Sequence, residues 1–189
     1  CPSRALVQES IFDSFVADGL KRVEATKQGD PLDTDTMIGA QASNDQLEKI
    51  TSYLDIGRQE GAEVLIGGAR AEMEGELAGG YYVQPTVFKG HNKMRIFQEE
   101  IFGPVLVILE AETLEDAIAM VNSNPNGNGT GLFTRSGGAA RHFQEEIDVG
   151  QVGINVPIPV PVPLFSFTGS RGSKLGDLGP YGKQVVQFY

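Results

Sequence analysis

Two adjacent carboxylates, Glu99 and Glu100, are the residues of this sequence that most clearly invite a chemical role. They open the run Glu-Glu-Ile-Phe-Gly-Pro, which ends at Pro104 just before a strongly apolar stretch. Neighbouring side chains of an extended chain point to opposite sides, so the two carboxylates are not a matched acid–base pair. From spacing alone, the pattern favours a solvated charge pair in front of a core strand.

Nucleophilic and metal chemistry have few candidates. The one cysteine, Cys1, would be a good nucleophile as a thiolate, but no base accompanies it. A reactive Cys1 would need a lowered pKa, and Arg4 is the cation near it in sequence. The two histidines, His91 and His142, are far apart and have no cysteine beside them, so the sequence predicts no metal site.

Two segments resemble known motifs without satisfying them. The glycines at 127, 129 and 131 are too closely spaced for a dinucleotide fingerprint and precede a predicted strand, so they indicate a turn. The prolines of residues 156–163 lie two apart, whereas a polyproline ligand repeats every three. Residues 156–165 cannot form a central strand because alternate amides are missing. Being apolar, this segment is expected to lie against protein, as a subunit contact or as the wall of a substrate tunnel.

Composition excludes several classes of protein. The chain has 189 residues, with 15 basic and 25 acidic side chains and a formal charge of −10. That balance argues against binding nucleic acid or an anionic membrane surface. No apolar run approaches the length of a membrane span, and one cysteine cannot form an internal disulfide. We expect a cytoplasmic protein. Because the first residue is Cys rather than Met, we also expect a fragment whose upstream part is missing.

Alternating strands and helices are expected to position these residues. Pro85 is expected to confine part of the β-prone stretch 81–88 to a sheet edge. Capping boxes are expected at Ser10–Asp13 and at Thr113–Asp116. The predicted strands lie at residues 5–7, 63–66, 104–110, 130–134 and 151–155, and the predicted helices start near residues 11, 44, 114 and 138.

This alternation predicts an α/β fold, a mainly parallel sheet with crossover helices. We expect a single domain over residues 1–189, in which residues 156–189 form an irregular tail rich in proline and glycine.

Several segments, in collinear order, resemble the NAD(P)-dependent aldehyde dehydrogenase superfamily. The run that begins at Glu99 resembles the family motif E-E-x-F-G-P. Residues 80–88 (GYYVQPTVF), 124–129 (NPNGNG) and 150–155 follow the same family. The resemblance covers essentially the whole chain and implies the fold of the catalytic domain, with the N-terminal cofactor-binding domain absent.

The resemblance also implies roles for individual residues. Glu100 matches the carboxylate that hydrogen-bonds the nicotinamide ribose, and Phe102 matches the aromatic residue beside the nicotinamide. Asn155, Phe165 and Phe167 match the segment that lines the aldehyde entrance, although Ser-Phe-Thr-Gly stands where the family has Pro-Phe-Gly-Gly. The family's catalytic cysteine aligns two positions before Cys1, so Cys1 is not expected to be the catalytic thiol.

Two branches of the family are represented along the chain. Residues 1 to about 100 resemble general aldehyde dehydrogenases. From about Val105 onward the chain is more similar to methylmalonate-semialdehyde dehydrogenase, the CoA-acylating branch. The matching segments are NPNGNGTGLFTRSGGAARHF, VGQVGINVPIPVP and FSFTGSRGS.

The implied function is part of an oxidoreductase that oxidises an aldehyde to an acid or an acyl-CoA. The reaction would pass through a cysteine thioester, with hydride transfer to NAD and CoA as a candidate second substrate. The resemblance implies a homo-oligomer, and this chain alone is expected to be inactive. The alternative is a stand-alone, non-catalytic interaction or oligomerisation domain with the same fold.

Overall fold

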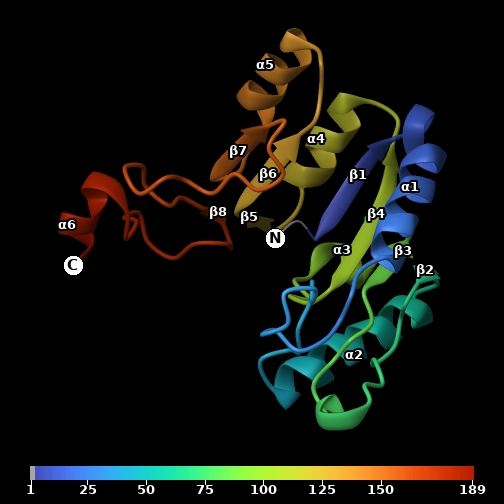
Figure 1. The fold of residues 1–189 in the computed structure, drawn as a ribbon. Helices are drawn as coiled ribbons and strands as arrows, with labels where there is room; N and C mark the ends of the chain where they lie inside the picture. The colour runs from blue at the N-terminus through green and yellow to red at the C-terminus, as the bar shows by residue number, and fades with distance from the viewer. Residues whose placement is uncertain (1–2) are drawn as a thin grey trace. The chain divides into compact units, whose positions relative to one another are not determined.

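The computed structural model describes residues 3–189, so Cys1 and every expectation that concerns it lie outside the described residues. The chain forms two compact units, residues 3–111 and residues 112–189. Each unit is described by itself (Figure 1). The single domain predicted over residues 1–189 stays a prediction.

The first unit is built on a four-stranded sheet with the order β1-β4-β3-β2. The central strand β4 pairs in parallel with both β1 and β3, and β2 runs antiparallel to β3. The predicted α/β fold with a mainly parallel sheet is therefore confirmed. The strands are β1 (Arg4–Gln8), β2 (Glu63–Ile66), β3 (Thr86–Lys89) and β4 (Val105–Ala111), and the helical segments are η1 (Glu9–Ile11), α1 (Phe12–Glu24), α2 (Asn44–Gln59), η2 (Gly75–Leu77) and α3 (Arg95–Gln98).

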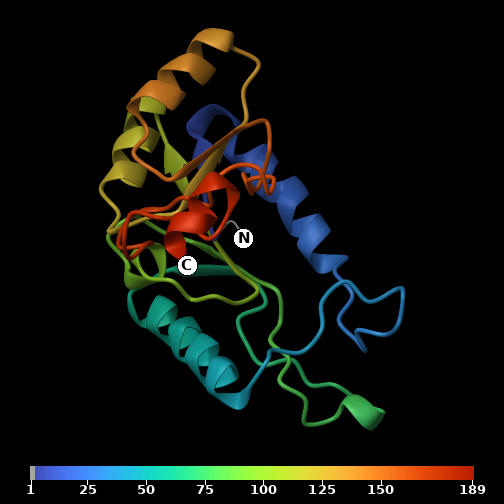
Figure 2. The ribbon, with the colours of Figure 1, turned by 90° about the vertical axis from the view of Figure 1, so that its left-hand side faces the viewer.

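The two long helices cover opposite faces of this sheet, as Figure 2 shows. Side chains of a strand alternate between faces. Val87 of β3 packs with Phe12 of α1, whereas the ring of its neighbour Phe88 lies against Gly57 of α2. Both strand residues are almost completely buried. The helix α2 contacts both β2 and α3, so it lies beside the segment that follows α3.

Two local expectations in this unit are wrong. Ser10 does not cap α1: residues 9–11 form a 3₁₀ turn, the amide of Phe12 already donates to the carbonyl of Glu9, and the helix begins at Phe12. Pro85 does not place the following residues at an edge. The strand β3 begins after Pro85, at Thr86, and lies between β2 and β4.

The second unit contains a parallel pair, β6 (Gly129–Leu132) and β7 (Gln151–Ile154), connected through the crossover helix α5 (Gly137–Glu146). The helix α4 (Leu114–Asn122) packs with α5 around Ile118 and Phe143. The capping box predicted at Thr113 and Asp116 is confirmed, with each side chain bonded to the other's backbone amide. A short antiparallel pair joins β5 (Asn126–Gly127) and β8 (Ser170–Arg171).

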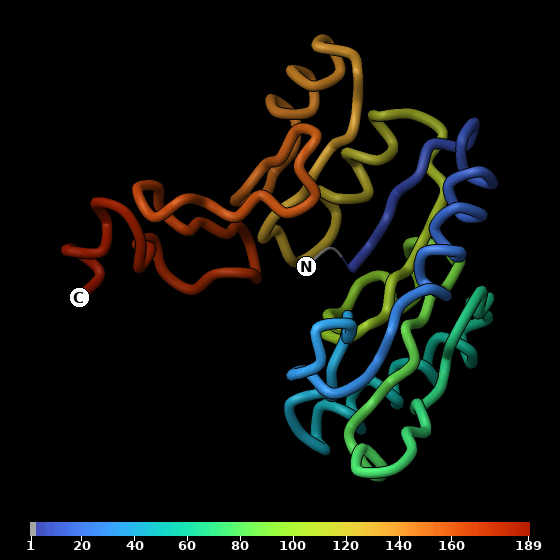
Figure 3. The backbone as a smooth tube through the Cα atoms, viewed as in Figure 1, coloured from blue at the N-terminus to red at the C-terminus, as the bar shows by residue number. Residues whose placement is uncertain are grey.

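Residues 156–189 contain little regular structure, as the tube in Figure 3 shows. Apart from β8, the regular elements of residues 156–189 are η3 (Gly182–Gln184) and α6 (Val185–Phe188). Among the described residues, 3–189, no helix has the length and apolar character needed to cross a membrane.

Candidate functional site

The two adjacent glutamates have different environments. The guanidinium of Arg95 donates two hydrogen bonds to Glu99, of 2.8 and 2.9 Å, and the hydroxyl of Tyr53 donates a third of 2.7 Å. These donors, Arg95 first, lower the pKa of Glu99 from its ordinary 4.5 to about 2. The same hydrogen bond to Glu99 raises the pKa of Tyr53. Glu99 is therefore an ionised carboxylate that joins Arg95 to Tyr53.

Glu100 has no such partner. Its side chain is exposed, and it forms no hydrogen bond or ion pair with any of residues 3–189. An exposed carboxylate offers two acceptor oxygens to a donor from outside the unit. Both glutamates are exposed, as the prediction of a solvated pair requires, but Glu99 is also bonded by Arg95 and Tyr53.

The backbone after Glu100 is held by Gln46 of α2. The side-chain amide nitrogen of Gln46 donates to the carbonyl oxygens of Ile101, at 3.3 Å, and of Phe102, at 2.6 Å. Phe102 has a φ of +58°, in the left-handed region that non-glycine residues rarely adopt. Ile101 is buried, but the ring of Phe102 is 72% exposed. The constrained backbone therefore presents this ring to the outside.

Close packing fixes the far end of the same loop. A Cβ on Gly103 would meet the Cδ1 of Ile50 at 2.5 Å, so no larger residue fits there without movement. The carbonyl oxygen of Pro104 then accepts a hydrogen bond of 2.9 Å from the amide of Thr86, which joins the loop to β3.

Three residues of α2 therefore hold the loop of residues 99–104. Gln46, Ile50 and Tyr53 have the spacing i, i+4, i+7, which places them on one face of a helix. Sequence reasoning missed Gln46, Tyr53 and Arg95 as contributors. The helical spacing on α2 was the available signal, together with the i, i+4 spacing of Arg95 and Glu99.

The loop suits the nicotinamide nucleoside end of NAD. A carboxylate without an internal partner can accept hydrogen bonds from two ribose hydroxyls. An exposed aromatic ring offers a flat apolar surface to a planar heterocycle. Glu100 and Phe102 are two residues apart on a backbone that α2 holds in place, so the residues present fit this group.

In the second unit, Asn155 shapes the turn that follows β7. Its φ is +57°, and its side-chain amide exchanges two hydrogen bonds with the backbone of Thr134, of 2.9 and 3.0 Å. The carbonyl of Val156 then lies over the paired glycines Gly131 and Gly153, where a Cβ would approach it to 2.6 and 2.8 Å. Asn155 therefore positions the start of the segment 156–165.

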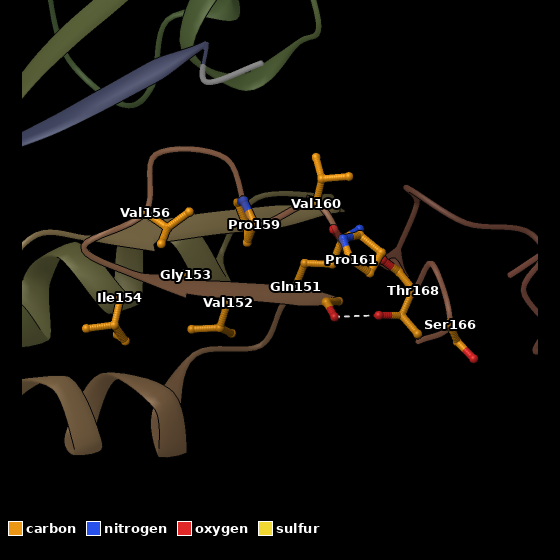
Figure 4. Close-up of a pocket in the computed structure, with 11 residues that line it drawn as sticks. Gln151, Val152, Gly153, Ile154, Val156, Pro159, Val160, Pro161, Ser166 and Thr168 are labelled. Carbon is orange, nitrogen blue, oxygen red and sulfur yellow. Dashed lines mark hydrogen bonds between the residues drawn. The ribbon is translucent and has the colours of Figure 1, made fainter. Parts of the chain in front are cut away.

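The two predicted wall aromatics have different surroundings. Phe165 is 66% exposed, whereas Phe167 is partly buried and packs edge-to-face on Tyr181 at 5.8 Å between ring centres. A hollow of about 390 Å³ lies beside them. Figure 4 shows it between β7 and the proline-rich segment, with Ser166 and Thr168 in its lining. Neither Phe165 nor Phe167 lines it, and their role at an aldehyde entrance stays a prediction.

The predicted site residues thus fall into two groups. Glu100 and Phe102 share one loop of the first unit, and Asn155, Phe165 and Phe167 belong to the second. Within residues 3–189, no cluster of three or more histidine, cysteine, aspartate or glutamate side chains could hold a metal ion.

Comparison with known proteins gives a consistent result. The aldehyde dehydrogenase family matches residues 1–189. The chain is 59% identical to acetaldehyde dehydrogenase 2 of Cupriavidus necator over 155 residues, which cover 82% of this chain and 31% of that protein. It therefore spans about a third of the length of this relative.

Solved structures agree with the fold. Methylmalonate-semialdehyde dehydrogenase from Oceanimonas doudoroffii matches with a TM-score of 0.93 and 36% identity, covering 99% of this chain and 38% of that one. Betaine aldehyde dehydrogenase from Staphylococcus aureus, in complex with NAD⁺, matches with a TM-score of 0.92 and 33% identity, covering 99% and 37%. Sequence and fold together lead to one conclusion: the chain belongs to the aldehyde dehydrogenase family.

Proposed function

We propose that residues 1–189 form part of the catalytic domain of an NAD-dependent aldehyde dehydrogenase. In this proposal Glu100 binds the nicotinamide ribose and Phe102 packs beside the nicotinamide ring. The observation that supports it is the contrast between the two glutamates. Glu99 accepts three hydrogen bonds from Arg95 and Tyr53, whereas Glu100 accepts none from residues 3–189 on the same anchored backbone.

NAD supplies the hydride acceptor when it is bound. The role of this chain is to orient the bound NAD. The carboxylate of Glu100 accepts hydrogen bonds from the ribose hydroxyls and so limits the rotation of the nucleoside, and the Phe102 ring limits its tilt. This is a positioning role rather than acid–base chemistry, because no proton moves to Glu100.

The aldehyde would be oxidised through a cysteine thioester, and water or CoA would release the acyl group. The resemblance implies that the nucleophile lies two positions before Cys1, so residues 1–189 by themselves are expected not to turn over. Asn155, Phe165 and Phe167 are proposed for the aldehyde entrance. The likeness of residues from about 105 onward to methylmalonate-semialdehyde dehydrogenase supports CoA as a candidate acceptor. We place the protein in the cytoplasm, as a homo-oligomer.

The test is the affinity for NAD of the protein that carries this sequence, measured by isothermal titration calorimetry. Glu100→Gln keeps the shape of the side chain and removes its charge, and we expect the Kd for NAD to rise about tenfold. Glu112→Gln is the matched control, since Glu112 is also an exposed glutamate. An unchanged Kd in Glu100→Gln would remove the proposed ribose contact.

A second candidate function rests on a separate observation. Along residues 156–165 the side chains Val160, Val162, Leu164 and Phe165 are each more than half exposed. Exposed apolar surface of this kind favours association with protein. A non-catalytic oligomerisation domain would therefore show concentration-dependent association in sedimentation, with no NAD binding. NAD binding that Glu100→Gln weakens would reject it.

A further inference from the structure

We propose that Asn128 is a site of spontaneous covalent modification, at which the side-chain amide is lost through a cyclic imide. The sequence contains two Asn-Gly pairs, Asn126–Gly127 and Asn128–Gly129, both in the second unit. A glycine after asparagine leaves its backbone nitrogen open to the asparagine side chain, because glycine has no Cβ to shield it. The surroundings of the two pairs differ, and those of Asn128 favour the reaction.

The reaction needs neither a cofactor nor a redox partner. The backbone nitrogen of Gly129 gives up its proton to solvent and attacks the side-chain carbonyl carbon of Asn128. A new C–N bond closes the imide ring, the C–N bond of the side-chain amide breaks, and the leaving nitrogen takes up a proton as ammonia. Water then opens the imide at either of its carbonyls, which leaves aspartate or isoaspartate at position 128.

The side chain of Asn128 is not held by the fold. Asn128 occupies the bend between β5 and β6, and the residue is exposed. Its carboxamide forms no hydrogen bond with any of residues 3–189. The side chain can therefore rotate toward the following peptide while water reaches it.

The attacking nitrogen, that of Gly129, is not used by the parallel pair of β6 and β7. The amide of Asn155 donates to the carbonyl oxygen of Leu132, which shows that Leu132 faces β7 with its backbone polar groups. Residues that bond to a neighbouring strand alternate along the chain, so Thr130 also faces β7 and Gly129 does not. Within residues 3–189, β6 has no strand on its other side that could accept this amide.

Asn126 is held in a way that opposes the same reaction. Its nucleophile, the amide of Gly127, donates a hydrogen bond of 3.0 Å to the hydroxyl of Ser173. The carbonyl oxygen of Asn126 accepts another of 3.0 Å from the guanidinium of Arg171. Turning this peptide toward the side chain would break both hydrogen bonds and the pairing of β5 with β8. Local opening must therefore precede any reaction at Asn126.

The modification changes the chain at the start of β6. Gly129 is the first residue of that strand and lies opposite Gln151 of β7. Either product adds a negative charge just before it, and isoaspartate also inserts a methylene group into the main chain. We expect the isoaspartate form to loosen the pair of β6 and β7, because pairing requires regular spacing along the backbone.

The experiment follows both asparagines in the protein that carries this sequence, during incubation at mildly alkaline pH in water enriched in heavy oxygen. Peptide mass spectrometry locates each conversion by the incorporated label, and chromatography separates isoaspartate from aspartate. We expect Asn128 to convert at least about tenfold faster than Asn126, whose reaction first breaks two hydrogen bonds. In urea, where the fold is lost, the two sites should convert at similar rates.

Matched variants separate the two environments. Gly129→Ala should slow the conversion of Asn128 severalfold, and its methyl group fits because the nearest atoms lie 3.4 Å away. Asn128→Gln should abolish the fast conversion, since the longer side chain closes a ring far more slowly. Ser173→Ala releases the amide of Gly127, so Asn126 should convert about fivefold faster. The rate at Asn128 should not change in Ser173→Ala.

Two results would overturn the proposal. One is conversion of Asn128 no faster than that of Asn126 in the folded protein, since the bend would then protect its asparagine as the strand does. The other is conversion of Asn128 without isoaspartate, because direct hydrolysis of the side chain gives aspartate alone. The added charge allows the product to be isolated by ion exchange. Faster hydrogen exchange of its β6 and β7 amides would support the loosening, and unchanged exchange would refute that part.

Discussion

The hydroxyl of Tyr53 donates a hydrogen bond of 2.7 Å to the carboxylate of Glu99, across 46 positions of the sequence. This contact gives the two adjacent glutamates different surroundings. Glu99 joins the loop to α2, and Glu100 has no partner among residues 3–189. A side chain that looks like half of a surface charge pair is therefore part of what holds the loop in place.

The strain at Phe102 gives a first prediction. Glycine adopts a φ of +58° without steric cost, but it also has more freedom in the unfolded chain, and these effects oppose each other. The exposed ring contributes little burial. We expect Phe102→Gly to change the free energy of unfolding by less than about 0.5 kcal/mol, while the Kd for NAD rises. Urea unfolding and calorimetry measure the two effects. A large loss of stability would mean that the ring packs against the protein.

Gly103 gives a prediction about packing. Gly103→Ala places a methyl group 2.5 Å from the Cδ1 of Ile50, which is completely buried. We expect a loss of about 1–3 kcal/mol in the free energy of unfolding. Ile50→Ala removes that Cδ1 atom and also the Cγ1 atom at 2.7 Å, so the double variant should lose less than the sum of the two single losses. Strict additivity in chemical denaturation would show that the two side chains do not meet.

The pKa of Glu99 predicts a dependence on pH. Its pKa is lowered from 4.5 to about 2, so its ionised form stabilises the fold above pH 4.5, and this contribution is lost as the pH falls toward 2. Arg95→Met should return the pKa toward its ordinary value. The stability difference from the unmodified protein should be full at pH 6 and shrink between pH 4.5 and 2. Because more than a third of Glu99 is exposed, we expect less than about 1 kcal/mol.

The control for that experiment is Arg70→Met. Arg70 donates to the carbonyl oxygens of Gly79 and Gly80, which do not titrate, so its stability difference should be flat over the same range. Urea unfolding at several pH values makes the comparison. A flat profile for Arg95→Met as well would contradict the assignment to Glu99.

The turn at Asn155 gives a fourth prediction. Both Asn155→Ala and Asn155→Gly lose the two hydrogen bonds to Thr134, but only alanine is strained at a φ of +57°. We expect both variants to be destabilised, and alanine by about 1 kcal/mol more than glycine. Chemical denaturation would show this difference. Equal losses would mean that the turn relaxes and that its left-handed conformation is not required.

Local patterns predicted much of the fold. The alternation of apolar stretches and capping residues located nearly every strand and long helix, including the strand at 63–66 and the capping box at Thr113. The expectation at Ser10 was wrong because residues 9–11 form a 3₁₀ turn, so the N-cap position of α1 falls on Ile11, whose side chain has no group that could cap the helix. Phe12 itself is buried against Val87 and Ile108, and contacts with such distant segments are not visible in a window of a few residues.

The sequence by itself determined the α/β class and most of the elements, because periodicity is a property of a short stretch of chain. The candidate residues Glu100 and Phe102 came from the resemblance of the sequence to the aldehyde dehydrogenase family. Only the tertiary structure decided which glutamate is free. Glu99 is bonded by Arg95, four residues before it, and by Tyr53, which reaches it from 46 positions away because α2 packs against α3. Contacts between distant segments follow from how whole elements pack, and they leave no regular spacing in the sequence.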